Sequence, residues 1–570
     1  MRAERRLDLV LLWHMHQPDY RDYETGEFRF PWTYLHVTKD YSDMAWHLEH
    51  HPGIRAVVNF TPVLLDQIED YSEQFASGRF RDPLLRLLAR AEKEPLSAAE
   101  RALILERCFQ AGHRGIIQPF PAYKALHELF AMTGFRGQDW SHYFSDQCFF
   151  DVLTWFHIGW TGETVRRSSE TVTRLMAVGT RFSHTDRLAL LELIGEQVRN
   201  IIPRYAKMAA AGAIELSTTP QHHPLAPLLM SFGTAREADP DVVLPQAPEY
   251  PGGTERLAAQ IRVAIDEHAR RFGEPPVGVW PAEGAISDGF LGLLASHGFK
   301  WTASGGQVLR NSLSATKTDA RDTSPYRAYC DAATSPGLAL FFREDRLSDL
   351  IGFEYARWHS RDATANFISR LEAIAAAADE DEVPLVSVIL DGENCWEYYP
   401  YNGYYFLDEL YRRLESHAGI RTTTYRVCVE REGEALAALD RVIAGSWVYG
   451  KFDTWIGSPD KNRAWDLLCA AKRSFDLVIG SGRLGAEQAR AAYRQLAACE
   501  ASDCFWWMGD YNPRAAVASF DALYRAGLAN LYRQLDLPVP AALAQAISHG
   551  EGEPEANGAI RRAIESSPTR

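Results

Sequence analysis

Two carboxylates, Asp391 and Glu393, come directly after the apolar run PLVSVIL (384–390). Such a run is typical of a buried strand, so polar side chains at its end can reach a ligand. Glu283 follows a second, shorter run, VGVW (277–280). Carboxylates on two different strands can flank a glycosidic bond, one as nucleophile or base and the other as acid. Glycoside hydrolysis is therefore one chemistry that these residues could carry out.

Aromatic residues stand beside both acids. Trp280 comes shortly before Glu283, and Trp396 and Tyr398 come shortly after Asp391. Flat rings of this kind can stack on the apolar face of a pyranose. The alternative is that they are core residues of a loop and an amphipathic helix, which is the commoner role of large aromatic side chains.

Histidines follow two further apolar runs. His14, His16 and Gln17 come after residues 7–13, and His223 comes after residues 213–217, the run that contains Glu215. The pair His14-x-His16, with help from His222, His223 and Asp391, could bind a metal ion for metal-assisted hydrolysis. The same histidines could instead hydrogen-bond a neutral ligand. The residue types alone leave both chemistries open.

Seven apolar runs alternate with helical patterns, and these elements must position the polar residues. The runs are LDLVLLW (7–13), IRAVVNF (54–60), AIELS (213–217), VGVW (277–280), FKWTAS (299–304), LALFF (338–342) and PLVSVIL (384–390). Alternation of strand and helix indicates an α/β barrel or a doubly wound sheet. Seven runs over this length favour a barrel, in which catalytic groups lie at the carboxyl ends of the strands.

The remaining segments suggest a division into three parts. Residues 1–400 are expected to form the catalytic barrel, with helical insertions at 83–133 and 150–212 and a long polar loop at 305–336. Residues 401–545, including 434–443, show mostly helical periodicity and are expected to form a C-terminal helical domain. The polar segment 546–570 is expected to be a flexible tail.

Composition excludes several classes of protein. The 570 residues carry a net charge of −15, which argues against nucleic-acid binding. The eight cysteines form no CxxC pair, so neither a disulfide framework nor a zinc ribbon is expected. The first apolar run is too short for a signal peptide, and no stretch approaches the roughly 20 residues of a membrane span. A cytoplasmic protein without a membrane partner is expected.

Four ordered motifs resemble those of glycoside hydrolase family 57. They are HMHQP (14–18), GAIELSTTPQHHPLAPLL (212–229), GVWPAEGAIS (278–287) and ILDGENCWEYYP (389–400). Later stretches, TWIGSPDKNRAWDLL (454–468) and FWWMGD (505–510), are also similar, so the resemblance runs from about residue 8 to about residue 545. It implies a distorted (β/α)7 barrel with a C-terminal helical domain. It also implies a retaining mechanism on α-glucans, with no metal and no other cofactor.

The resemblance also implies roles for single residues. Glu283 is the nucleophile, and Asp391 is the general acid/base, with a pKa raised by burial and neighbouring charge. His14 and His16 hydrogen-bond sugar hydroxyls, and Glu393 holds a hydroxyl or tunes Asp391. The other residues expected to bind substrate are Gln17, Glu215, His223, Trp280, Trp396, Trp455 and Trp465. For Glu215 a structural role weighs equally, and Trp455, Trp465, Asn462 and Asp466 either close the cleft or pack the domain. FWWMGD (505–510) is expected in the core.

Several functions stay open. The motifs around Asp391 and in residues 454–468 look most like those of α-amylases and amylopullulanases, which act on α-1,4 and α-1,6 linkages. Gly305 and Gly306 stand where an acidic pair is usual in the family, and TTPQHHP (218–224) lacks the usual aromatic before the histidine. A 4-α-glucanotransferase or branching enzyme is the near alternative. A metal-dependent deacetylase or amidohydrolase and a non-catalytic glycan-binding protein are the distant ones.

Overall fold

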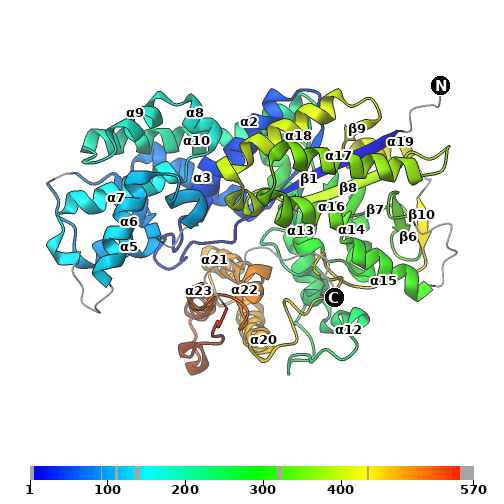
Figure 1. The fold of residues 1–570 in the computed structure, drawn as a ribbon. Helices are drawn as coiled ribbons and strands as arrows, with labels where there is room; N and C mark the ends of the chain where they lie inside the picture. The colour runs from blue at the N-terminus through cyan, green and yellow to red at the C-terminus, as the bar shows by residue number, and fades with distance from the viewer. Residues whose placement is uncertain are drawn as a thin grey trace.

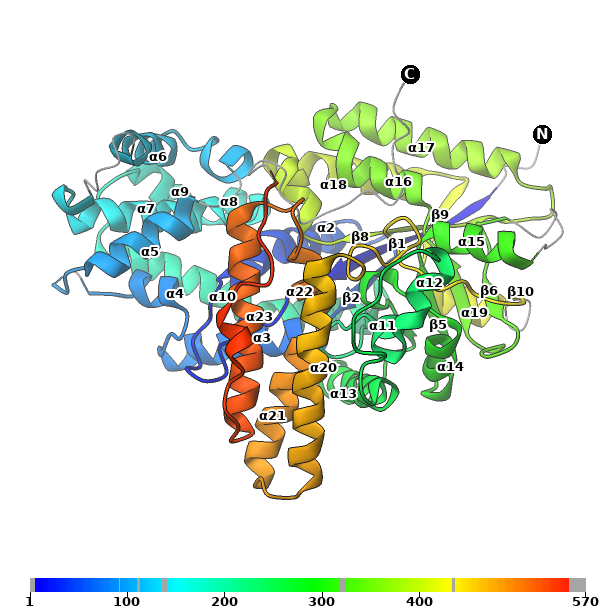
Figure 2. The same cartoon turned by 90° about the horizontal axis from the view of Figure 1, so that it is seen from below.

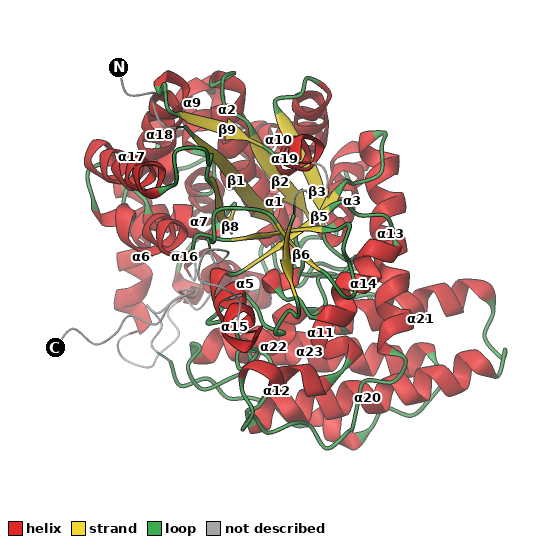
Figure 3. Ribbon diagram, turned by 90° about the vertical axis from the view of Figure 1, so that its right-hand side faces the viewer, coloured by secondary structure: helices red, strands yellow, loops and turns green. Residues whose placement is uncertain are grey.

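In the described residues, ten strands form one sheet. The sheet lies among the helices that surround it (Figure 3). The computed structural model describes residues 6–91, 93–109, 113–134, 141–316, 324–432 and 436–552. In chain order the strands are β1 (Leu7–Met15), β2 (Ala56–Phe60), β3 (Ile214–Thr218), β4 (Gly278–Val279), β5 (Trp301–Ser304), β6 (Tyr329–Asp331), β7 (Ala339–Phe342), β8 (Leu385–Asp391), β9 (Ile420–Thr423) and β10 (Ala437–Leu439).

The seven predicted runs are the seven strands of a parallel barrel. Their order is β7-β5-β4-β3-β2-β1-β8, and every neighbouring pair is parallel. The ring closes through a parallel bridge between Arg343, just after β7, and Ser387 of β8. There the backbone N–H of Glu344 donates to the Ser387 carbonyl at 2.7 Å. The prediction of a distorted (β/α)7 barrel is confirmed.

Strand β1 shows how side-chain alternation builds the barrel. All nine of its residues are buried, as expected of a parallel strand covered on both faces. Leu9, Leu11 and Trp13 pack outward in the large core beneath the helices, whereas Val10 and Leu12 belong to the small core inside the barrel. Because side chains alternate along a strand, His14 continues the inward row.

Helices fill the connection between β2 and β3 and cover that side of the barrel (Figure 1). Helices α1 (Trp32–His36) and α2 (Ser42–His50) lie between β1 and β2, and α3 (Pro62–Ser77) begins the connection between β2 and β3. The insertion holds α4 (Pro83–Leu88), α5 (Ala98–Phe109), α6 (Pro121–Gly134), α7 (Asp146–Gly159), α8 (Glu163–Ser168), α9 (Glu170–Val178) and α10 (His184–Ala210). The predicted helical insertions are therefore present where the structure describes the chain.

The other barrel helices are α11 (Ala226–Met230), α12 (Ala235–Ala238), α13 (Gly253–Phe272), α14 (Asp288–Ser296), α15 (Gly306–Thr316), α16 (Asp345–Asp349), α17 (Ser360–Ala377), α18 (Tyr404–Ser416) and α19 (Tyr425–Glu432). The expectation of a long loop at 305–336 is wrong over α15 and β6. Residues 306–316 are largely polar, so their helical character was not evident from the sequence. Strand β6 pairs antiparallel with β7 toward the edge of the sheet. Residues 317–323 lie outside the described parts.

The C-terminal helices form a separate layer across the barrel and the insertion (Figure 2). They are α20 (Pro459–Gly480), α21 (Ala486–Cys499), α22 (Ser502–Trp507) and α23 (Arg514–Gln534). Strands β9 and β10 precede them and join the barrel sheet through β1 and β6, so the helical prediction for 434–443 is wrong over β10. We propose that the helical domain begins near α20 rather than at residue 401. Of the predicted tail, residues 553–570 lie outside the described parts.

Among the helices in the described parts of the chain, none has the length and apolar character needed to cross a bilayer.

Candidate active site

A cleft of about 560 Å³ lies at the carboxyl ends of the barrel strands. Strand ends supply His14, His16, Gln17, His223, Glu283, Arg343, Asp391 and Glu393 to its wall. The insertion supplies Arg107, Phe109 and Trp160, and the C-terminal helices supply Asp503, Trp506, Trp507 and Phe520. Three regions far apart in sequence thus enclose one site. A concave site that combines aromatic walls with convergent polar groups is typical of a small-molecule site.

The register of β1 brings its first histidine to the centre of the site. His14 pairs with Asn59 of β2 on one side and with Asp391 of β8 on the other. Its Nδ1 lies 2.6 Å from Asn59 Oδ1, and its Nε2 lies 3.1 Å from His223 Nε2. Burial, together with the neighbouring His16, lowers the pKa of His14 to about 3. His14 is therefore neutral at physiological pH.

The hydrogen bonds fix the proton positions along a chain of side chains. Asn59 donates its amide hydrogens within the barrel, so its Oδ1 accepts and His14 carries its proton on Nδ1. His223 must then donate from Nε2 to His14, which leaves its Nδ1, 2.8 Å from Ser502 Oγ, as an acceptor. Ser502 Oγ also lies 3.2 Å from Glu283 Oε1 but has only one proton to give. The chain is complete when Glu283 is protonated.

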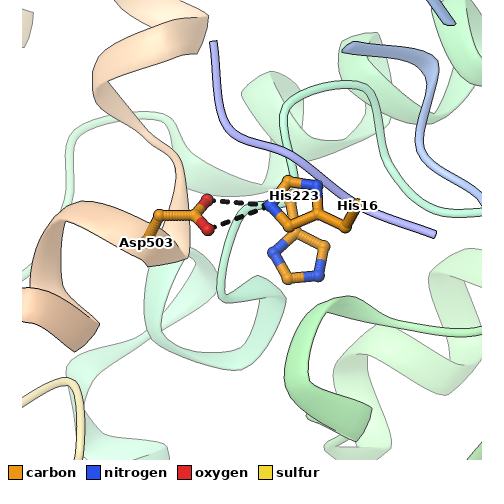
Figure 4. Close-up of side chains that lie close together, drawn as sticks. All are labelled: His16, His223 and Asp503. Atoms are coloured by element: carbon orange, nitrogen blue, oxygen red, sulfur yellow. Dashed lines mark hydrogen bonds and ion pairs between the residues drawn. The ribbon is translucent and has the colours of Figure 1, made fainter. Parts of the chain in front are cut away.

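His16 and His223 stack face to face, and Asp503 reaches them from the C-terminal helices (Figure 4). The two ring centroids are 3.8 Å apart, with 19° between the ring planes. His16 Nε2 lies 3.0 Å from both oxygens of Asp503, and its Nδ1 lies 3.1 Å from Thr61 Oγ1. Asp503, on α22, therefore ties the helical domain directly to the end of β1.

Two residues of the site have backbone conformations that L-residues rarely adopt. His223 has φ = 58° and Glu283 has φ = 57°. Such conformations persist only when the surroundings hold them, and they cluster at functional sites. Here the His223 carbonyl accepts from the Ser502 N–H at 2.9 Å, and the Glu283 carbonyl accepts from the Trp447 N–H at 2.9 Å. Segments from the C-terminal part of the chain thus clamp both residues.

The two proposed catalytic carboxyls both have raised pKa values. Burial raises the pKa of Glu283 to about 8, with help from the charges of Asp503 and Asp391, against hydrogen bonds from Trp447 and Ser502. Burial raises the pKa of Asp391 to about 6, and the Asn394 amide, 3.0 Å from its Oδ2, opposes the rise. This order is the reverse of the one expected for an ionised Glu283 and a protonated Asp391.

Trp447 contacts Glu283 through both backbone and side chain. Its Nε1 lies 3.1 Å from Glu283 Oε2, and its ring meets Trp280 edge to face at 5.3 Å. Gly305 permits this approach, since a Cβ there would lie 2.6 Å from the Trp447 Cα. Gly306 likewise faces the Arg343 carbonyl, at 2.7 Å from where a Cβ would lie. Acidic side chains in place of Gly305 and Gly306 would therefore clash with this arrangement.

Gln17 and Glu393 both line the cleft. Gln17 Nε2 donates to Glu393 Oε1 at 3.3 Å, and the His16 N–H donates to the same oxygen at 3.3 Å. Burial first, and then the nearby Asp391, raise the pKa of Glu393 well above its usual value. Its Oε2 is buried without a hydrogen-bond partner among the described residues. That oxygen is suited to accept a hydrogen bond from a ligand hydroxyl.

Five residues expected to bind substrate do not line the cleft. Glu215 accepts from Trp301 Nε1 at 2.6 Å and from the Arg426 N–H at 2.8 Å, where it fixes the start of α19. Trp396 is buried in the large core, where its ring packs 5.8 Å from that of Trp13. Trp280 lies beneath the cleft, with its ring centroid 6.4 Å from that of His14.

The tryptophans of residues 454–468 also pack away from the cleft. Trp465 Nε1 donates to the Trp455 carbonyl at 3.0 Å, and the Trp465 ring stacks on Phe505 at 4.1 Å. Both tryptophans are fully buried in the core shared by the barrel and the C-terminal helices. Asn462 and Asp466 bond to backbone groups of residues 243–247. The domain-packing alternative therefore describes these four residues.

The sequence reasoning missed residues on the C-terminal side of the cleft. FWWMGD (505–510) was expected in the core, yet Trp506 and Trp507 line the cleft. The motif was a usable signal for Asp503, which stands two residues before it. Trp447 and Ser502 lie in segments without a motif of their own, so no pattern in the sequence pointed to them.

His16, His223 and Asp503 are also close enough together to hold a cation, since one ligand atom from each lies within 4.8 Å of the others. The cluster thus differs from the expected set, in which His14, His222 and Asp391 took part. His16 and Asp503 already satisfy each other, and His223 is engaged by His14 and Ser502. The metal-dependent alternative can therefore be tested by adding a chelator and measuring activity.

Comparison with known proteins places the chain in a defined group. The family model for glycosyl hydrolase family 57 matches residues 10–436. No curated protein sequence matches. The fold resembles a GH57-type branching enzyme from Pyrococcus horikoshii (TM-score 0.55, 15% identity, 98% of this chain and 100% of that chain).

Two further solved structures share the fold. One is the α-amylase AmyC from Thermotoga maritima, with a TM-score of 0.55 and 14% identity over 93% of this chain and 94% of that chain. The other is a 4-α-glucanotransferase from Thermococcus litoralis, with a TM-score of 0.50 and 12% identity over 93% of this chain and 60% of that chain. At these identities the likeness concerns the fold and leaves the substrate open.

Proposed function

Because the chain belongs to glycosyl hydrolase family 57, we propose that it cleaves α-glucans by a retaining double displacement. Glu283 is the proposed nucleophile and Asp391 the proposed general acid/base. The observation that carries this proposal is the convergence of both carboxyls on one cleft, from the ends of β4 and β8, beside the cluster of His14, His16 and His223.

The reaction follows from the chemistry of two carboxyls. The Glu283 carboxylate forms a bond to the anomeric carbon while the glycosidic C–O bond breaks, and Asp391 gives its proton to the leaving oxygen. Water then gives a proton to Asp391 and its oxygen to the anomeric carbon, which frees Glu283. The neutral His14 and the unpartnered oxygen of Glu393 can hold sugar hydroxyls throughout.

The proton of the carboxyl pair must move from Glu283 to Asp391 for this reaction. Asp391 is one of the groups that raise the pKa of Glu283, so protonation of Asp391 makes Glu283 easier to ionise. Trp447 Nε1 can donate to the ionised Glu283. Ser502 Oγ can donate to it as well once its single proton turns from His223 Nδ1 to Glu283 Oε1. In the active state the two carboxyls therefore hold one proton between them, with Asp391 protonated and Glu283 ionised.

One observation favours an alternative to hydrolysis, namely transfer of the glycosyl group from Glu283 to a second sugar. The C-terminal helices place Trp506, Trp507 and Phe520 against the cleft, opposite the strand ends. Aromatic walls displace water and offer stacking surfaces for an acceptor sugar. A 4-α-glucanotransferase or branching enzyme would use the same Glu283 intermediate. The motif at residues 454–468, which suggested an amylopullulanase, packs the domain instead and does not bear on the substrate.

A cytoplasmic location is part of the proposal. All eight cysteines are free thiols, and seven of them are buried. Proteins of oxidising compartments commonly pair their cysteines, whereas reduced thiols are usual in the cytoplasm. The acidic net charge of −15 supports a neutral polysaccharide as partner and argues against nucleic acid.

Product analysis tests the proposal. The wild type, Glu283→Gln and Asp391→Asn are incubated with soluble starch, maltoheptaose and pullulan. Controls are Asp379→Asn and Glu380→Gln, which change two exposed carboxyls before β8. We expect new reducing ends with the wild type and both controls, and a loss of at least about 10³-fold in each site variant.

Other results discriminate between the alternatives. Redistributed chain lengths without new reducing ends would establish transfer in place of hydrolysis. Full activity of either site variant would refute the assignment of the two acids. Activity abolished by a chelator and restored by zinc would favour the metal-dependent alternative at His16, His223 and Asp503.

A further inference from the structure

A second group of histidines and carboxyls lies outside the cleft, between α2 and α18. His47 and His51 come from the end of α2, and Asp408 comes from α18. One ligand atom from each lies within 4.8 Å of the others. Figure 1 shows the two helices side by side on the face of the barrel away from the C-terminal helices. We propose that these three residues bind a divalent transition-metal ion of the zinc type.

The first support is an unsatisfied buried histidine. His47 is 0% exposed, and neither of its ring nitrogens has a hydrogen-bond partner among the described residues. A buried polar group without a partner is unfavourable and calls for an explanation such as an ion. The His47 ring faces α18, at 5.4 Å from the ring of Tyr404 and 6.4 Å from that of Tyr411. Asp408 lies on the same side of α18 as these tyrosines, since residues three and four apart share a helix face.

The second support is the geometry of the other two ligands. His51 Nε2 lies 3.3 Å from Asp408 Oδ1. Bonds of about 2.0–2.2 Å to a tetrahedral zinc ion would hold two ligand atoms about 3.4 Å apart, so these two atoms already have the right separation. The Asp408 side chain is 46% exposed, which leaves water access for a fourth ligand and an entry path for the ion.

The third support is a residue that orients one ligand. Glu415 Oε2 lies 2.9 Å from His51 Nδ1, and its Oε1 accepts from the Gly53 N–H at 2.7 Å. A carboxylate on the far nitrogen of a histidine is the usual partner of a zinc-bound imidazole, because it fixes the tautomer that presents Nε2 to the metal. Gly53 permits the close approach, since a Cβ there would lie 3.0 Å from Glu415 Oε1.

The ligand types select the class of ion. Two imidazoles and one carboxylate suit zinc, cobalt or nickel, whereas calcium and magnesium prefer oxygen ligands. His47 and His51 are four positions apart at the end of α2, and Asp408 lies on α18. An ion bound by these three residues would therefore link the two helices. Helix α18 follows the segment that carries Asp391 and Glu393, so an ion that fixes α18 would also help to hold that segment in place. This site lies outside the cleft and is independent of the proposed function.

Cobalt and zinc binding test the site directly. Full-length protein without a histidine tag is stripped with a chelator, dialysed and titrated with Co²⁺, whose visible absorption reports tetrahedral coordination, and with Zn²⁺ by calorimetry. Asp408→Asn and His51→Gln remove ligands, and Glu415→Gln removes the orienting residue. His50→Ala is the matched control, because His50 is an exposed neighbour that stacks on Trp46.

We expect one tight ion in the wild type and in His50→Ala, and loss of that ion in Asp408→Asn and His51→Gln. Glu415→Gln should weaken binding by about 10- to 100-fold. Saturating zinc should raise the melting temperature of the wild type by a few degrees and leave Asp408→Asn unchanged.

The cleft provides the competing location. Asp503→Asn removes a member of the other histidine cluster, so it should leave the proposed site intact. Binding that is lost in Asp503→Asn but kept in Asp408→Asn would overturn the proposal and place the ion in the cleft. Absence of tight binding in the wild type would also overturn it, with buried water the explanation for His47.

Discussion

In the proposed mechanism, one proton shared by Glu283 and Asp391 decides at the level of single residues whether the site is active. Burial raises the pKa of Glu283 to about 8 and that of Asp391 to about 6. Below about pH 6 both carboxyls are protonated and no nucleophile is available. Above about pH 8 both are ionised and no acid is available. The pair titrates as a unit, so these values belong to the two groups together.

We therefore predict a bell-shaped dependence of kcat/KM on pH, with limbs near pH 6 and pH 8. The measurement is the initial rate on maltoheptaose at low substrate concentration across pH 4 to 10. A rate that stays flat across the alkaline limb would mean that Asp391 does not supply the proton.

Asp503→Asn should move this profile toward acid. The charge of Asp503 is the second cause of the raised pKa of Glu283 and also contributes to that of Asp391. Its removal makes ionisation easier in both, so both limbs fall to lower pH. Asp510→Asn, an exposed change on the same segment, is the control and should leave the profile in place. An unmoved profile in Asp503→Asn would show that the charge of Asp503 does not reach the pair.

Strand ends made part of the site predictable from sequence. His14, Glu283 and Asp391 follow apolar runs, and the parallel barrel brings such ends together. The aromatic residues beside the acids predicted the substrate site less well, because a large apolar side chain can equally fill the core, as Trp396 does. Trp447 reaches Glu283 from a loop 164 residues away, a contact that only the tertiary fold creates.

Helix α22 is the element that completes the cleft. It carries Asp503 and Trp507, and the Trp507 ring stacks on Phe520 of α23 at 4.6 Å with 7° between the ring planes. Trp507→Ala should lower kcat/KM on maltoheptaose by about 10-fold, because a stacking surface of roughly 1–1.5 kcal/mol is lost. Trp358→Ala is the control, since Trp358 is 45% exposed and does not line the cleft. Equal kinetics in the two variants would exclude α22 from substrate binding.

The elements themselves were unequally predictable. The barrel strands lie in runs that are mostly apolar because both faces of the strands are buried, and this pattern is visible in the sequence even for the two-residue β4, which lies within VGVW (277–280). Strands β6 and β10 are three residues each and lie toward the edge of the sheet, where pairing depends on neighbours rather than on hydrophobic pattern. Helix α15 begins at glycine and is largely polar, so the same segment looked like a loop.

At the scale of the whole molecule, the buried ion pair between Arg256 and Glu500 anchors the helical domain to the barrel. Glu500, between α21 and α22, is fully buried, and Arg256 donates to its two oxygens from Nε and Nη2, each at 2.8 Å. Tyr250 and Gln260 donate to the same carboxylate. The segment that follows carries Ser502 and Asp503, so this anchor also sets the position of two residues in the site.

Glu500→Gln should lower the free energy of unfolding by about 3–5 kcal/mol, because it leaves the buried Arg256 charge unpaired. Activity should fall as well, as the segment with Asp503 loses its fixed position. Denaturant unfolding measures the first effect. Glu192→Gln, which breaks the exposed pair with Arg199, is the control and should change stability by no more than about 0.5 kcal/mol. Equal stability of the two variants would contradict the anchor.

The measurement that tests the account most directly is the configuration of the first products. Proton NMR follows maltoheptaose with the wild type and with Glu283→Gln, at times shorter than mutarotation. We predict that new anomeric protons, in free ends or in new linkages, appear first in the α configuration and are absent with Glu283→Gln. First products in the β configuration, or unchanged turnover by Glu283→Gln, would contradict a retaining mechanism through Glu283.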